Sequence, residues 1–127
     1  MISAAILLAA SPISDLDAAS IESGNAWFSC VDLSSRQLSH LPEEPLSLAI
    51  GALEYCRTKE RIFLVDLIKF SQGRGEERAA SVAAAHSYLE GAKAEAKQRS
   101  VGTILHLRHP EAYAALTALE REIDAPK

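Results

Sequence analysis

CVDLSSRQLSHLPEEPLSLAIGALEYC, the stretch from Cys30 to Cys56, decides how this chain folds. Its two cysteines lie almost symmetrically about a proline-flanked centre that runs from Pro42 to Pro45. Residues before proline avoid the α-helical region, so one helix is expected to end here and another to begin with Pro45 in its first turn. An antiparallel helical hairpin that folds back at this point brings the two sulfur atoms to the same height. We therefore predict a disulfide between Cys30 and Cys56, with Cα atoms no more than about 7 Å apart.

The predicted disulfide also bears on where the protein works. Disulfides form and persist in oxidising compartments, so the pair predicts a periplasmic or secreted protein. The alternative is two buried free thiols in a cytoplasmic protein, because free cysteine is among the most buried residue types. A redox-active pair is disfavoured, since the chain has no Cys-x-x-Cys motif and no cation beside both thiols.

The N-terminal segment, residues 1–10, is a second indication of export. Only Ser3 among these residues is not hydrophobic, and the run matches the h-region of a signal peptide in length. Two features weigh against this interpretation: no Lys or Arg precedes the run, and cleavage after Ala10 would put Leu8 where a small residue is preferred. The alternative is a buried first helix of the mature fold. We interpret residues 1–10 as a signal peptide and residues 11–127 as a single helical domain.

Composition and charge limit the remaining possibilities. With 127 residues, of which 48% are hydrophobic and 24% charged, the chain has the ordinary composition of one globular domain. The net charge is −4, and all of this excess lies in residues 1–72. No basic face large enough to hold a phosphate backbone is evident, so we expect no nucleic-acid partner. The N-terminal apolar run is far shorter than the roughly 20 residues of a membrane span, so we expect none in the mature chain.

Apolar residues at helical spacing predict an all-α fold, a small bundle of four or five helices that contains the disulfide-stapled antiparallel hairpin. Ser14 and Asp17 form an approximate capping box, so a helix could already begin within residues 11–22. The main predicted helices cover residues 23–39, 46–70 and 77–99, and another begins at Pro110. Two segments are left open between helix and strand, namely residues 62–68, which are rich in β-branched side chains, and residues 101–108, which contain Gly102.

The predicted helix over residues 46–70 has the longest apolar stripe, so we expect it to be the central helix. Its expected buried residues are Leu53, Phe63, Leu64 and Leu67. Trp27, the only tryptophan, is expected in the core. Antiparallel register puts Lys59 at the level of Trp27, so this cation is expected to cap the indole ring.

No motif names a reaction. The histidines are His40, His86, His106 and His109; His106 and His109 could share a helical face, but Pro110 separates the conceivable third ligand, Glu111, from them. The chain has no His-Glu-x-x-His motif and no Gly-x-Ser-x-Gly motif, and its Gly-Arg-Gly turn lacks the ending of a phosphate loop. We therefore assign no catalytic, cofactor-binding or metal-binding residue.

One resemblance covers residues 27–56. It rests on Trp27-Phe-Ser-Cys30, Leu38, Pro42, Pro45, Ala49 and Ala52-Leu-Glu-Tyr-Cys56. This pattern resembles small exported bacterial proteins of alphaproteobacterial type, in which a cysteine in one helix is followed by a proline-containing turn and an alanine-rich helix with a second cysteine. The resemblance implies a periplasmic location and a stapled hairpin, and it carries no catalytic residue over.

We expect a non-enzymatic structural or protein-interaction module that contacts an unidentified protein partner through the alanine-rich face of the helix over residues 77–99. The alternative is an enzyme or a small-ligand-binding protein whose site assembles from scattered polar residues, with His86, His106 and His109 the first to test. A deep pocket lined by convergent polar groups would favour the alternative. An exposed apolar patch would favour the interaction module.

Overall fold

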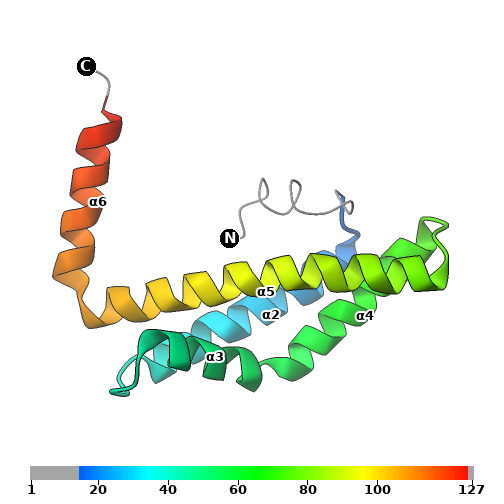
Figure 1. Cartoon of the computed structure of the whole chain (residues 1–127), viewed down its shortest axis with the longest axis horizontal. Coiled ribbons are helices and arrows are strands. Elements are labelled where there is room, and N and C mark those ends of the chain that lie inside the picture. The colour runs from blue at the N-terminus through cyan, green and yellow to red at the C-terminus, as the bar shows by residue number, and fades with distance from the viewer. Residues whose placement is uncertain (1–14, 126–127) are drawn as a thin grey trace.

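The computed structural model describes residues 15–125, which form five helices; four of them pack as a bundle and the last projects from it (Figure 1). The helices are α2 (Ala18–Leu38), α3 (Pro45–Tyr55), α4 (Arg57–Gly73), α5 (Arg78–Arg108) and α6 (Pro110–Asp124). These residues contain no strand, and the predicted all-α bundle is confirmed. Both segments left open between helix and strand are helical, one within α4 and one within α5. The predicted signal peptide lies outside the described residues.

Helix α2 begins earlier than predicted. Asp17 is its N-cap residue, and its carboxylate accepts a hydrogen bond from the backbone N–H of Ser20 at 3.0 Å. This bond satisfies one of the amide groups that a helix start leaves without a partner. Asp17 is therefore the N-cap residue of α2. The sequence had suggested Ser14 as the N-cap and Asp17 as the partner three residues later in a capping box. Ser14 lies outside the described residues.

The hairpin predicted around the two prolines is present. Helix α2 ends at Leu38 and α3 begins with Pro45 at its first position. The Arg108 side chain at the end of α5 holds the intervening loop by donating hydrogen bonds to three backbone carbonyls, at 2.9 Å to Ser39, at 2.7 Å to Glu43, and also to Leu41. This guanidinium satisfies carbonyls of the loop between α2 and α3 and ties the loop to the end of α5.

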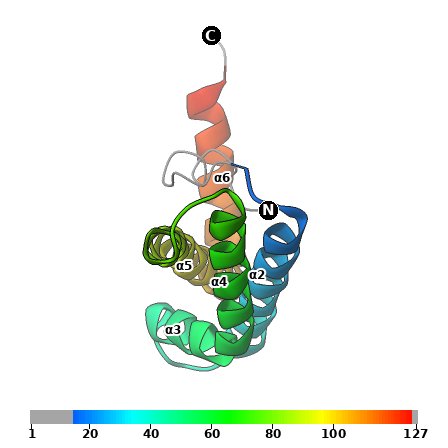
Figure 2. The same ribbon diagram turned by 90° about the vertical axis from the view of Figure 1, so that its right-hand side faces the viewer.

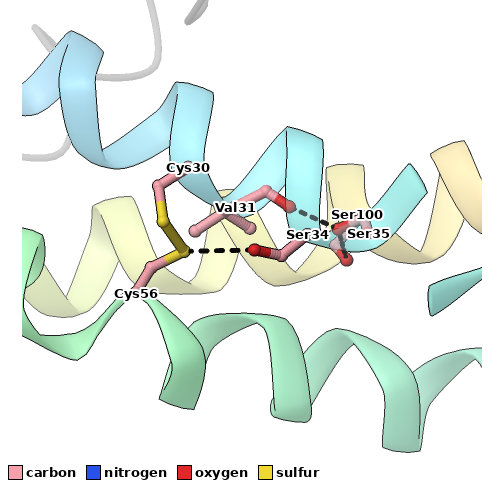
Figure 3. The surroundings of a disulfide bond; sticks show 6 residues. All are labelled: Cys30, Val31, Ser34, Ser35, Cys56 and Ser100. Carbon is pink, nitrogen blue, oxygen red and sulfur yellow. Dashed lines mark hydrogen bonds between the residues drawn. A yellow bond between two sulfur atoms is a disulfide. The ribbon is translucent and has the colours of Figure 1, made fainter. Parts of the chain in front are cut away.

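The predicted disulfide is confirmed (Figure 3). Cys30 on α2 is bonded to Cys56 at the junction of α3 and α4, and their Cα atoms are 5.9 Å apart. Cys56 is buried, and the Ser34 hydroxyl lies 3.5 Å from its sulfur. The bond therefore fastens the first arm of the hairpin to the middle of the second arm.

The single helix predicted over residues 46–70 is wrong, because the chain bends at Cys56. The backbone there leaves helical geometry, with φ −96° and ψ 16°. The Cys56 N–H is shared between the carbonyls of Ala52 and Leu53, both at 3.2 Å, and a new helix begins at Arg57. No proline or glycine marks the bend, and the apolar stripe runs on across it, so the sequence pattern did not reveal it.

The central helix is α5 and not the segment that the sequence favoured. Helix α5 packs against all four other helices, α2, α3, α4 and α6. Figure 2 shows it lying beside α4 and above α3. Its contact face consists mainly of alanine and serine, which let neighbouring backbones approach closely, together with three larger side chains. The buried members of this face are Ser81, Ala85, Tyr88, Leu89, Ala92, Ala96, Ser100 and Ile104.

Aromatic side chains fill the centre of the bundle. Trp27 is fully buried, as predicted, and its ring centroid lies 5.9 Å from that of Phe63. Tyr88 of α5 meets Phe63 edge-on at 6.3 Å. Burial raises the pKa of the Tyr88 phenol to about 12, and the nearby Glu95 carboxylate adds to this shift. Of the other residues expected in the core, Phe63 and Leu67 are buried, whereas Leu53 and Leu64 are only half-buried.

The predicted cation over Trp27 is wrong. Trp27 is fully buried with Phe28 and Phe63 as its aromatic neighbours, whereas Lys59 is exposed. Lys59 instead borders a shallow surface hollow together with Cys30 and Tyr55. The bend at Cys56 changes the register on which that expectation depended.

Several buried positions are serines. Ser35 of α2 donates a hydrogen bond to the Val31 carbonyl at 2.7 Å, and its hydroxyl shares a second hydrogen bond with Ser100 of α5 (Figure 3). Buried hydroxyls are tolerated when such partners are present. Within residues 15–125 the buried serines are Ser20, Ser23, Ser34, Ser35, Ser71, Ser81 and Ser100.

Gly24 offers a test of the close packing between α2 and Phe63 of α4. A Cβ at Gly24 would lie 2.9 Å from Cε1 of Phe63, whose ring is held between Trp27 and Tyr88 and cannot withdraw freely. We expect Gly24→Ala to lower the free energy of unfolding by about 1 kcal/mol, because an overpacking cost of about 1–3 kcal/mol exceeds the helix-propensity gain of about 1 kcal/mol. Thermal and urea unfolding measure the change.

The matched control is Gly91→Ala, where a Cβ meets no atom within 4 Å. Gly91 also lies in a helix, so the propensity gain applies there without the clash, and we expect stabilisation by up to about 1 kcal/mol. An equal gain in both variants would show that Phe63 moves aside easily and would contradict tight packing at Gly24.

Candidate functional site

A groove of about 580 Å³ lies between α2 and α5. Its α2 wall runs from Asn25 to Arg36, and its α5 wall runs from Ala96 to Leu107. Tyr113, near the start of α6, lines one end of the groove. The Ser35–Ser100 hydrogen bond joins α2 and α5 at this level, so the two walls are held together.

The groove combines apolar surface with positive charge. The Arg99 guanidinium carbon lies 5.8 Å from the centroid of the half-buried Phe28 ring, a cation–π distance. Arg36 forms an exposed ion pair with Asp32 at 3.0 Å. Two arginines against one aspartate leave the groove with a positive balance, which suits a partner of opposite charge.

The end of the groove at α6 is aromatic. The rings of His106 and Tyr113 meet edge-on with centroids 4.3 Å apart. This contact joins the last turns of α5 to the first turn of α6, across the sharp change of direction at Pro110 (Figure 1). The apolar surface of α6 is therefore next to the groove.

Helix α6 has no buried residue, although it carries large apolar side chains. Among the described elements it packs only against α5, and it projects away from the bundle (Figures 1 and 2). Its exposed large apolar residues are Tyr113, Leu116, Leu119 and Ile123, the stripe that the sequence showed. Each of the helices α2 to α5 buries part of its surface in the bundle, whereas α6 buries no residue, so its hydrophobic face has no partner among the described residues.

Acidic side chains border this stripe. At 3.6 residues per turn, Leu116, Leu119 and Ile123 share one face of the helix. Glu120 and Asp124 fall along one edge of this face. Glu111 and Glu122 fall along the other edge, and Arg121 lies on the opposite side of the helix. The surface of α6 is therefore apolar in the middle and negative on both sides.

The structure does not bring the candidate histidines together. His86 and His106 both lie on α5, and their separation of 20 residues along one helix corresponds to about 30 Å. His109 is exposed at the junction of α5 and α6, and His86 and His106 are exposed as well. Within residues 15–125, no three His, Cys, Asp or Glu side chains gather where a metal ion could be held.

The prediction that the alanine-rich face of the helix over residues 77–99 contacts a protein partner is wrong. The alanine-rich face of α5 is covered, because Ala85, Ala92 and Ala96 pack against other helices of the same chain. The groove arginines, Arg36 and Arg99, were not foreseen, because their proximity arises only when α2 and α5 pack together. The α6 stripe was visible in the sequence, but its exposure was not.

The fold and its disulfide define a small disulfide-stapled bundle of α-helices. Searches among protein-family models, curated proteins and solved structures find no match to this chain. No helix in the described part of the chain has both the length and the apolar character needed to cross a bilayer.

Proposed function

We propose that this protein is an exported, non-enzymatic interaction module that presents α6 to a protein partner. The observation that carries the proposal is the exposed apolar stripe of α6, a helix without a buried residue that packs only against α5 among the described elements. Helices with apolar anchors at such spacing commonly bind in an apolar groove of a partner.

The energetics support an interaction surface. Full burial of a large apolar side chain contributes about 1.5–3 kcal/mol, and Tyr113, Leu116, Leu119 and Ile123 are 45–73% exposed, so each offers part of this contribution to an association. An exposed contiguous apolar patch of this kind marks an interaction site more often than it marks ordinary surface. The remaining helices form the scaffold that holds the stripe away from the bundle.

The disulfide supports the proposed export. Cys30 and Cys56 are bonded to each other, and no free cysteine occurs in the described part of the chain. Such bonds persist in the periplasm or outside the cell and are rare in a reducing cytoplasm. The apolar N-terminal run of residues 1–10 is consistent with a cleaved signal peptide.

Site-specific photo-crosslinking in the cells that make the protein tests the interaction. A photoreactive phenylalanine analogue in place of Leu116 is expected to give a discrete higher-mass adduct in the exported fraction. Ile62, which is similarly exposed but lies on α4, is the matched control and is expected to give none. The mass of the exported chain also reports whether residues 1–10 have been removed.

Two outcomes would contradict the proposal. Absence of an adduct at Leu116 would mean that α6 has no protein partner. Equal adducts from Leu116 and Ile62 would mean that the contact is not specific to α6.

A further inference from the structure

We propose that the partner of α6 is a second copy of this chain, and that α6 of each copy lies in the α2–α5 groove of the other. This inference rests on the proposed function, because it names the partner of the same exposed helix. The result is a two-fold dimer in which one helix-in-groove contact occurs twice.

The dimensions of helix and groove agree. Helix α6 has 15 residues and is about 22 Å long. The groove walls, from Asn25 to Arg36 and from Ala96 to Leu107, are each about 16 Å long at the helical rise of 1.5 Å per residue. The apolar stripe from Leu116 to Ile123 covers about 10 Å, so it fits within the groove.

The charges of the two surfaces are complementary. Helix α6 carries four carboxylates and one arginine, and the arginine lies on the side away from the stripe. The groove carries Arg36 and Arg99 against Asp32, which is already paired with Arg36. A docked α6 would place its acidic edges beside these arginines and its leucines beside the Phe28 ring.

The same charges disfavour direct pairing of two α6 helices. If the two stripes faced each other, the acidic edges Glu120/Asp124 and Glu111/Glu122 of one copy would lie beside acidic edges of the other. Like charges held this close repel, and Arg121 is on the wrong side of the helix to relieve them. The groove of a second copy is therefore a better binding site for α6 than the α6 helix of that copy.

The shape of the chain allows two copies to dock α6 in each other's groove and form a closed dimer. Helices α5 and α6 form an L (Figure 1), and Tyr113 of α6 is one of the residues that line the groove. A two-fold axis that bisects the corner of the L interchanges the directions of α5 and α6. Each α6 then runs along the groove of the other copy, and the assembly is complete at two chains.

The proposal is tested by the mass and dissociation constant of the exported, disulfide-bonded protein, measured by light scattering and sedimentation. The wild-type protein is expected to have twice the mass of one chain. Leu119→Glu on α6 and Arg99→Glu in the groove are each expected to raise the dimer dissociation constant by about 100-fold or more, because each dimer loses two contacts and a tenfold loss per contact is modest.

Ile62→Glu is the matched control. Ile62 on α4 and Leu119 on α6 are both 52% exposed, so the two substitutions make the same chemical change at equal exposure. The control is expected to leave the dissociation constant unchanged. Circular dichroism checks that every variant is folded, and exposed positions of this kind should not disturb the core.

Mixing the two defective variants distinguishes helix-in-groove exchange from helix–helix pairing. The Leu119→Glu chain keeps an intact groove, and the Arg99→Glu chain keeps an intact α6. A mixture is expected to form heterodimers through the one intact contact, with affinity between those of the wild type and of either variant alone. Direct α6 pairing predicts instead that Arg99→Glu dimerises like the wild type and that mixing restores nothing, a result that would overturn the proposal.

Other occupants of these surfaces give different results. A monomeric wild-type protein overturns the proposal. If the Leu116 crosslink then maps to another protein, the proposed function stands and only the second copy is excluded. A crosslink from Leu116 to residues 1–14 of the same chain would assign the stripe to that segment and overturn the dimer. A monomer without any Leu116 adduct contradicts both the dimer and the proposed function.

Discussion

Reduction of the Cys30–Cys56 disulfide is expected to lower the free energy of unfolding by roughly 3–4 kcal/mol. The two cysteines are 26 residues apart in the sequence, and the bond removes the loop-closure entropy of that segment from the unfolded chain. The loss is a large part of the roughly 5–15 kcal/mol that holds a domain folded. Urea unfolding of the oxidised and the reduced protein measures it as a shift of the transition midpoint.

The position of the bond adds a structural reason for this effect. Cys56 lies where α3 ends and α4 begins, so the bond fastens α2 to the one point of the second arm that lacks regular helical geometry. The double variant Cys30→Ala/Cys56→Ala is the control, because its midpoint should not respond to reductant. Equal midpoints for the oxidised and reduced wild type would mean that the bend at Cys56 is stable without the bond.

Leu67→Ala is expected to lower the free energy of unfolding by about 2–5 kcal/mol, whereas Leu119→Ala should change it by no more than about 0.5 kcal/mol. Leu67 is fully buried in the core, and its truncation removes apolar contacts and leaves a cavity. Leu119 is 52% exposed on α6 and leaves no cavity. Both changes remove the same atoms, so the difference reports burial alone.

The comparison is best made in the Arg99→Glu background, where association through α6 is expected to be lost. Thermal and urea unfolding at a concentration confirmed as monomeric give the two values. Leu64→Ala should fall between them, because Leu64 is only half-buried. An effect at Leu119 equal to that at Leu67 would mean that α6 belongs to the cooperative core of the monomer.

Part of the candidate site was visible in the sequence. The stripe Tyr113, Leu116, Leu119 and Ile123 was evident from its helical spacing. Its exposure was not, because every amphipathic helix shows such a stripe and most bury it in their own domain. The groove was not visible at all, since Arg36 and Arg99 are far apart in the chain and meet only across α2 and α5.

The burial of the interior serines could not be predicted from the sequence either. Ser35 and Ser100 read as polar surface in any hydropathy pattern, yet they are buried and bonded to each other between two helices. Most buried hydroxyls in proteins have a hydrogen-bond partner, as Ser35 and Ser100 do here. That partner comes from a helix 65 residues away, so no local signal could have marked either serine as buried.

The all-α character, the turn at Pro42–Pro45 and the disulfide were predictable from the amino-acid sequence. They depend on local geometry, because proline restricts its own neighbourhood and two cysteines equally distant from a turn come close together. The bend at Cys56, the central place of α5 and the exposure of α6 became visible only in the folded structure. Helical periodicity shows which face of a helix is apolar, but the neighbour that covers this face is chosen by packing between segments far apart in the chain.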